Sequence, residues 1–187
     1  MKPIILASSS PRRKELLEKH QIDFRIEYKE IEEILDQSLS LSKRLEKLAY
    51  QKAEPIAKKY PNDIVIGADT MVVLDDEMLG KPKDKDDAKR MLKNMSAKRQ
   101  VVYSAVAIFE GEQVTTFCDQ CGVIFKPLSE QEIEEYLLED EWIGKAGGYA
   151  IQGIAGKFVD HIDGDIETVI GLPVRMIKEY LNTRNNK

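Results

Sequence analysis

The chain has 187 residues, of which 42% are hydrophobic, so it can bury a core of ordinary size and is not expected to be disordered. It carries 28 Lys and Arg against 33 Asp and Glu, a formal net charge of −5, which argues against general binding to nucleic acid or to an anionic membrane. No apolar run approaches the roughly 18 residues of a membrane helix, and "IILA" is too short for a signal-peptide core, so the sequence predicts a cytoplasmic protein without a membrane partner.

The first expected elements are a buried strand in residues 2–8 and a helix that begins at Pro11. Ser10 is a suitable N-cap, and proline is favoured at the first helical position. The adjacent residues Arg12 and Arg13 fall on the first turn, where the helix dipole is already positive. We therefore expect an anion to compensate these two charges.

The remaining expected elements alternate between strands and helices. They are a strand at 24–31, an amphipathic helix at 40–60, two strand-like runs within 63–79, a helix at 81–96, a hairpin at 100–125 that turns at 110–113, a helix at 129–142, an irregular glycine-rich stretch at 144–165 and a helix at 171–184. This mixture predicts an α/β fold. We expect one domain over residues 1–187, in which two lobes share the chain.

Two segments carry residues suited to phosphate chemistry. The Ser8–Arg13 turn offers hydroxyl groups, arginines and the N–H groups of a helix start, which together suit a phosphate, although a capped helix with solvated arginines is an alternative. Asp69, in "VIGADTMVV", stands at an apparent break in a buried strand. It is suited to holding a divalent metal or activating a water, and the alternative is a turn aspartate bonded to its own backbone.

Other candidates are weaker when taken singly. Lys52, Lys81 and Lys145 are either phosphate ligands or surface lysines, and Glu32 and Glu33 are either metal ligands or part of a solvated face.

The glycine-rich stretch "GKAGGYAIQG" contains Gln152, whose amide offers both a donor and an acceptor. Such an amide can read the edge of a nucleobase, although a glutamine that caps backbone groups in a tight loop is the alternative. Cys118 and Cys121 form "CDQC", which could be a redox or zinc site. On a strand, residues three apart face opposite sides, so two ordinary thiols are expected.

Six motifs in order resemble the Maf family of nucleotide pyrophosphatases, also called septum-formation proteins. They are "LASSSPRRKELL", "LAYQKA", "IGADTMV", "GKP", "KAGGYAIQG" and "VIGLPV", and they span residues 4–181. The resemblance implies a mixed sheet with helices on both sides and two lobes around a deep cleft, similar to inosine triphosphate pyrophosphatases. It also implies a homodimer that uses Mg²⁺ or Mn²⁺ to hydrolyse nucleoside triphosphates to the monophosphate and pyrophosphate.

Within the family, "GADT" and "AIQG" resemble the branch that acts on dTTP and UTP. The resemblance makes Asp69 the proton acceptor and makes Arg12, Thr70 and Gln152 the specificity positions. The matching polar cleft positions are Ser8, Arg13, Glu33, Lys52 and Lys81. We expect Glu33 and Asp69 to hold the metal.

The sequence departs from the family in its middle segment, where Ala97, Gln100, Ser104 and Ala105 replace the usual glycine, histidine, threonine and glycine. Gly144 also stands where many members carry Asp before the lysine. These departures concern rate and substrate breadth, because the motifs themselves are intact.

Two alternatives remain open from the sequence. The first is a nucleotide-binding regulator of septum formation or cell division with little turnover, although binding alone does not need a base such as Asp69. The second is a pyrophosphatase for modified pyrimidine nucleotides, which the branch motifs do not exclude. Binding of nucleic acid through the arginine pair fits poorly with the acidic composition and the lack of an aromatic stacking platform.

Overall fold

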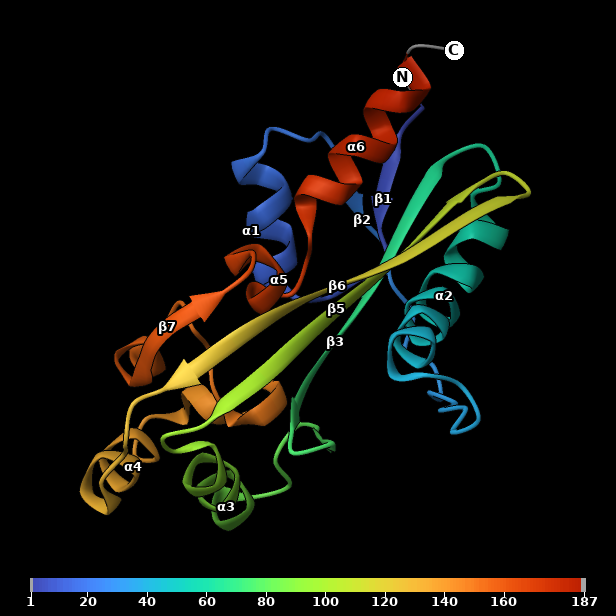
Figure 1. The fold of residues 1–187 in the computed structure, drawn as a ribbon. Helices are drawn as coiled ribbons and strands as arrows, with labels where there is room; N and C mark the ends of the chain where they lie inside the picture. The colour runs from blue at the N-terminus through green and yellow to red at the C-terminus, as the bar shows by residue number, and fades with distance from the viewer. Residues whose placement is uncertain (1, 186–187) are drawn as a thin grey trace. The chain divides into compact units, whose positions relative to one another are not determined.

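The computed structural model describes residues 2–185, and this part of the chain forms a mixed α/β fold, as predicted (Figure 1). It contains six α-helices and a seven-stranded sheet. The strand order is β2-β1-β3-β5-β6-β7, with β4 paired to β3. β1 (Ile4–Leu6) runs parallel to β2 (Arg25–Ile26) and β3 (Ile64–Leu74), whereas β4 (Glu77–Leu79) is antiparallel to β3. Among the residues described, no helix combines the length and apolar character that crossing a membrane requires.

The chain packs as two compact units. Within the described residues, unit 1 comprises 2–69, 104–119 and 171–185, and unit 2 comprises 70–103 and 120–170. β3, β5 and β6 each contribute residues to both units.

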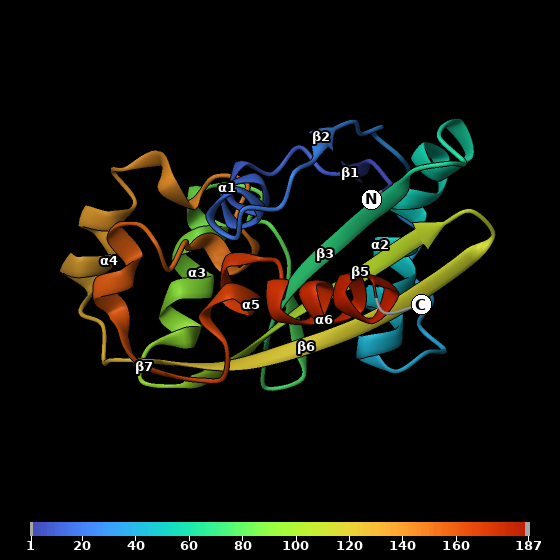
Figure 2. The ribbon, with the colours of Figure 1, turned by 90° about the horizontal axis from the view of Figure 1, so that it is seen from above.

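Three helices belong to unit 1: α1 (Pro11–Lys19), α2 (Leu41–Lys59) and α6 (Val174–Asn185). Figures 1 and 2 show α2 on one side of the unit's strands and α1 and α6 on the other. The helical face of α1 buries Leu16 and Leu17, as predicted. The turn between β1 and α1 and the helix α2, which carries Lys52, therefore belong to the same unit.

β2 is much shorter than the strand expected at 24–31. It contains only two residues, and both are exposed, so no buried face supports a longer strand. The loop that follows leads through Glu33 to α2.

β3 corrects the expectation that Asp69 lies at a break between two strands. The strand runs without interruption from Ile64 to Leu74, and Asp69 is extended within it. Gly67 suggested a turn because glycine favours both turns and bulges. In the structure this glycine instead meets α2 closely, a contact that local sequence cannot reveal.

The β5–β6 hairpin is confirmed. β5 (Arg99–Glu110) and β6 (Gln113–Phe125) are joined by a short turn in which Gly111 has φ +59°. Cys118 and Cys121 lie on β6, and neither forms a disulfide within the described residues.

Unit 2 contains α3 (Lys85–Met95), α4 (Glu130–Tyr136), α5 (Ile166–Ile170) and β7 (Val159–Asp163). The expectation of an irregular stretch at 144–165 is partly wrong, since it contains 3₁₀ turns and β7. These elements are three to five residues long, too short for a periodic signal.

An aromatic cluster forms part of the core of unit 2. Phe125 meets Tyr149 edge to face with ring centroids 5.0 Å apart, and Tyr136 meets Phe158 in the same way at 5.3 Å. This cluster anchors the end of α4 beside the glycine-rich segment.

The capping box predicted at the start of α4 is present between Ser129 and Glu132.

Candidate functional site

Lys52 on α2 lies between two carboxylates. Its Nζ donates to Oδ1 of Asp69 and forms an ion pair with Oε1 of Glu33 at 2.9 Å. The exposed fraction of the side chain is 10% for Asp69, 23% for Lys52 and 47% for Glu33, so solvent reaches the cluster from the Glu33 side. The structure thus brings together three of the predicted site residues.

Gly67 explains how Lys52 reaches Asp69. Residues 67 and 69 share one face of β3, because side chains alternate along a strand. A Cβ atom at position 67 would lie 2.5 Å from the carbonyl oxygen of Ala49 and 2.7 Å from Cβ of Ala53. The absence of that atom lets α2 pack close to the face that carries Asp69.

The turn before α1 is organised by Arg13. Its Nη1 donates to Oγ of Ser8 at 3.0 Å, and its Nε donates to the carbonyl oxygen of Gly171 at 2.9 Å. Ser8 is buried, and its hydroxyl also accepts the N–H of Ser10 at 3.3 Å. The alternative of a solvated arginine is therefore wrong for Arg13, which is tied to the protein at two points.

Arg13 interacts electrostatically with the carboxylates of Asp69 and Glu33. Burial lowers the pKa of Arg13 below its ordinary value, and the negative charge of Asp69 opposes this change. The positive charge of Arg12 also lowers the pKa of Arg13, whereas the negative charge of Glu33 raises it. Arg12 is half-buried on the first turn of α1. Lys52 and Arg13 are therefore the cations of unit 1 that act on the buried Asp69 carboxylate.

Unit 2 brings together two motifs that are distant in sequence. The N–H of Gly147 donates to the carbonyl oxygen of Gly80 at 3.0 Å, which places the residues before Lys81 against the glycine-rich segment. Gly147 and Gly148 have φ of +69° and +73°, a left-handed conformation that favours glycine. Lys81 and Gln152 are both exposed in this region.

Thr70 follows Asp69 within β3. Because neighbouring residues of a strand face opposite sides, the Thr70 side chain does not share the face that carries Asp69. Thr70 belongs to unit 2 together with Lys81 and Gln152. The predicted site residues of unit 1 are Ser8, Arg12, Arg13, Glu33, Lys52 and Asp69.

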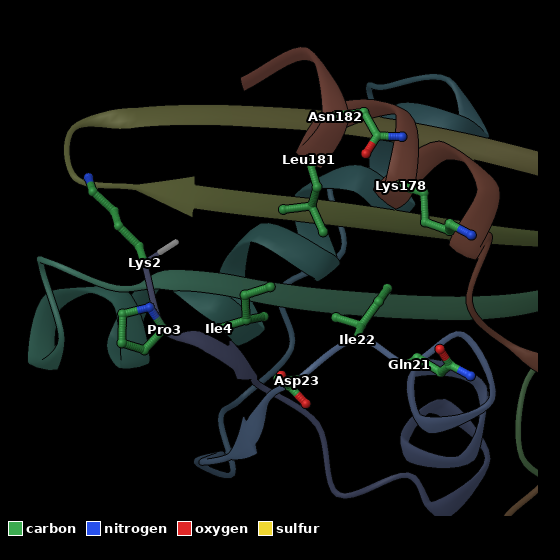
Figure 3. Close-up of a pocket in the computed structure, with 9 residues that line it drawn as sticks. All are labelled: Lys2, Pro3, Ile4, Gln21, Ile22, Asp23, Lys178, Leu181 and Asn182. Carbon is green, nitrogen blue, oxygen red and sulfur yellow. The ribbon is translucent and has the colours of Figure 1, made fainter. Parts of the chain in front are cut away.

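A cavity of about 380 Å³ lies elsewhere in unit 1 (Figure 3). It is lined by residues 2–4, residues 21–23 and three residues of α6. None of the predicted site residues lines it. The chemistry expected from the sequence therefore does not belong to this cavity.

Comparison with known proteins identifies the family. Residues 3–184 match the sequence model of the family described as Maf-like protein. The chain belongs to the Maf family. A dTTP/UTP pyrophosphatase of Bacillus mycoides is 45% identical over 180 residues, which cover 96% of this chain and 94% of that protein. A dTTP/UTP pyrophosphatase of Bacillus velezensis is 45% identical over 183 residues, which cover 96% and 97% of the two chains.

The Maf chain offers a small donor set for a divalent cation. Among residues 2–185, no three His, Cys, Asp or Glu side chains gather as a metal site. Magnesium in nucleotide enzymes is commonly held by one or two carboxylates together with substrate phosphates and water. Glu33 and Asp69 already converge on one cation, the ammonium group of Lys52, so this donor set fits such an ion.

The sequence did not predict the contributions of two residues, Gly171 and Glu141. Gly171 accepts a hydrogen bond from Arg13 across 158 positions, and only its place in the motif "VIGLPV" hinted at a role. Glu141 accepts hydrogen bonds from the backbone N–H groups of Ile154 and Ala155, just after Gln152, and no local sequence pattern indicated this role.

Proposed function

We propose that this Maf protein is a nucleoside triphosphate pyrophosphatase that hydrolyses dTTP and UTP to the monophosphate and pyrophosphate. The observation that carries the reaction type is the buried Asp69 carboxylate, with Lys52 bonded to it and Arg13 within its electrostatic reach. The relatives named dTTP/UTP pyrophosphatase, about 45% identical over nearly the whole chain, support the choice of substrates.

The cations match the charge of the substrate. A nucleoside triphosphate carries roughly four negative charges, and proteins bind such groups with Arg, Lys and helix N-termini. Arg12, Arg13 and Lys52 of unit 1 are the proposed phosphate ligands, and the assignment of Lys81 stays a prediction from the family resemblance. Ser8 positions Arg13 by accepting its hydrogen bond.

The reaction is a displacement by water at the α-phosphorus. A bond forms between the water oxygen and the α-phosphorus, and the bond from that phosphorus to the bridging oxygen breaks, so pyrophosphate leaves. Asp69 accepts the proton that the water loses. Glu33 and Asp69 would hold Mg²⁺ or Mn²⁺, which supplies neutralisation of the phosphate charge when bound. Arg12, Thr70 and Gln152 select the base.

A nucleotide screen tests this proposal. Purified protein is incubated with Mg²⁺ or Mn²⁺ and, separately, dTTP, UTP, CTP, GTP, ATP or 7-methyl-GTP, and pyrophosphate and phosphate are assayed separately. We expect pyrophosphate from dTTP and UTP and little from the purine nucleotides. Tight nucleotide binding without pyrophosphate would instead support the regulator of septum formation.

Assembly is a separate proposal. The family resemblance supports a homodimer, which light scattering of the purified protein would test. The cytoplasmic location and the absence of nucleic-acid or membrane partners stay predictions.

A further inference from the structure

The segment Gly148–Ala155, which carries Gln152, is held at both ends by side chains from outside it. At its far end, the Glu141 carboxylate accepts the N–H of Ile154 at 2.7 Å through Oε2 and the N–H of Ala155 at 3.2 Å through Oε1. At its near end, the Tyr136 hydroxyl donates to the carbonyl oxygen of Gly148 at 3.1 Å.

The two holding side chains also meet each other. The Tyr136 oxygen lies 3.2 Å from Oε1 of Glu141, so its one proton is shared between that carboxylate and the Gly148 carbonyl. Tyr136 is buried, and burial raises its pKa, so the hydroxyl stays a donor across the neutral range. The result is one continuous polar network within unit 2.

The carboxylate serves N–H groups that would otherwise lack partners. Ile154 and Ala155 begin the 3₁₀ helix that runs to Phe158, and the first N–H groups of a helix have no partner inside it. Hydrogen bonds from backbone N–H groups to an ionised carboxylate are about twice as strong as neutral ones. Glu141 therefore fixes where the chain leaves Gln152.

Gly153 is required for this contact. A Cβ atom at position 153 would lie 2.0 Å from Oε2 and 2.5 Å from Cδ of Glu141. The carboxylate is the end of a flexible side chain, so alanine at this position would displace it without disturbing the core. The residue that follows Gln152 is thus a glycine because the carboxylate occupies the place of its side chain.

We propose that Glu141 and Tyr136 are positioning residues that hold the Gln152 amide in place to select the pyrimidine base. The inference rests on the proposed function, because it gives Gln152 a base to read. An amide on an exposed, unrestrained loop would lose conformational freedom on binding, and fixing the loop beforehand removes that cost. Discrimination by a hydrogen-bonding site also depends on placement of its donor and acceptor.

Steady-state kinetics with UTP and GTP test the proposal. For Glu141→Ala we expect KM for UTP to rise about tenfold, the equivalent of about 1.4 kcal/mol, and the preference for UTP over GTP to fall by a similar factor. The value of kcat should change less than about threefold, because Glu141 does not touch the reacting atoms. Glu141→Gln keeps one acceptor and should restore part of the loss.

Three further variants sharpen the test. Gly153→Ala should reproduce the effect of Glu141→Ala, and Tyr136→Phe should cause a smaller loss in the same direction. Glu139→Ala is the matched control, since it removes an exposed carboxylate two residues away and should leave the kinetics unchanged. Gly153→Ala and Tyr136→Phe also keep the inference testable if Glu141→Ala fails to fold.

A double-variant cycle separates positioning from general support of the fold. In a Gln152→Ala background, Glu141→Ala should have little further effect on the preference for UTP, because both changes act through the same amide. Additive effects would overturn the inference.

Hydrogen exchange supplies a readout that does not depend on turnover. The amides of Ile154 and Ala155 should lose protection in Glu141→Ala. Loss of protection with unchanged preference for UTP would mean a purely structural contact, which overturns the inference. A wild-type protein that releases no pyrophosphate would overturn the proposed function, and this failure would be seen before any variant is made.

Discussion

Lys52 and Asp69 form a hydrogen-bonded ion pair that joins α2 to β3. Asp69 is the more buried partner, and Lys52 shares its ammonium group with Glu33 at 2.9 Å. Breaking a partly buried ion pair by removing one charge leaves the other without full compensation. The roles of the two residues are therefore best separated with substitutions that preserve size.

The variant Asp69→Asn is expected to reduce kcat for UTP by about 10²–10⁴-fold, the usual loss when a general base is removed. The amide has the size of the carboxylate but cannot take up the proton. Pyrophosphate release measures the rate, and a thermal melt checks that the fold is intact. Asp63→Asn is the control. Asp63 lies outside the site, where its Oδ2 forms an ion pair with Nη2 of Arg25 at 2.6 Å. Nearly full turnover in folded Asp69→Asn would rule out Asp69 as the base.

Gly67→Ala is expected to destabilise the protein by about 1–3 kcal/mol, the usual cost of overpacking. The new Cβ atom would meet Ala53 and the backbone of Ala49, and α2 would have to move. Urea unfolding measures the loss. Adding Ala53→Gly should recover only part of it, since the Ala49 carbonyl oxygen remains. Gly80→Ala is the control for stability, because a Cβ atom there would meet nothing within 4 Å. Equal losses in the two glycine variants would contradict this account.

Ala97→Gly is expected to raise the free energy of unfolding by about 0.5–1 kcal/mol, because Ala97 has φ +57° and glycine adopts this conformation without a steric penalty. Ala105→Gly should lower it by about the same amount, since Ala105 is buried in the extended strand β5. The family resemblance predicts glycine at both positions, yet the expected signs differ. Urea midpoints measured side by side test this, and a shared sign would show that backbone conformation is not the cause.

Stability is expected to decline as the pH rises from about 9 to 11. Burial raises the pKa of Cys118 from 9.0 to about 11, and a hydrogen bond from Ser42 opposes this only in part. The unfolded thiol therefore loses its proton in a range where the folded thiol keeps it, which favours unfolding. Urea midpoints at pH 8, 9 and 10 measure the decline, which should be shallower in Cys118→Ala. Identical slopes in both proteins would contradict the assignment to Cys118.

Local sequence patterns were sufficient to predict the elements that have a regular buried face or a capping motif. Leu16 and Leu17 on α1, and the Ser129 and Glu132 pair at the start of α4, were confirmed because their signals are local. The five-residue elements α5 and β7 were missed, since neither is long enough to show a period.

The site was less accessible to sequence reasoning. The types of its residues could be predicted, but their contacts depend on chain segments far apart. The sequence predicts a strand break at Asp69 because Gly67 favours turns. In the structure Gly67 instead makes room for Ala53, a tertiary contact that the local sequence does not reveal. Likewise, the hydrogen bond from Arg13 to Gly171 and those from the backbone beyond Gln152 to the Glu141 carboxylate depend on folding. No local pattern of residue types could predict them.

The glycine at position 67 has a consequence for redesign. Because one missing methyl group sets the spacing of a helix and a strand, the separation of the Lys52 ammonium and the Asp69 carboxylate is governed by small apolar residues behind them. Libraries that vary only positions 49, 53 and 67 would scan this separation while leaving every charged group in place. The chemistry of the site could then be adjusted from its uncharged side.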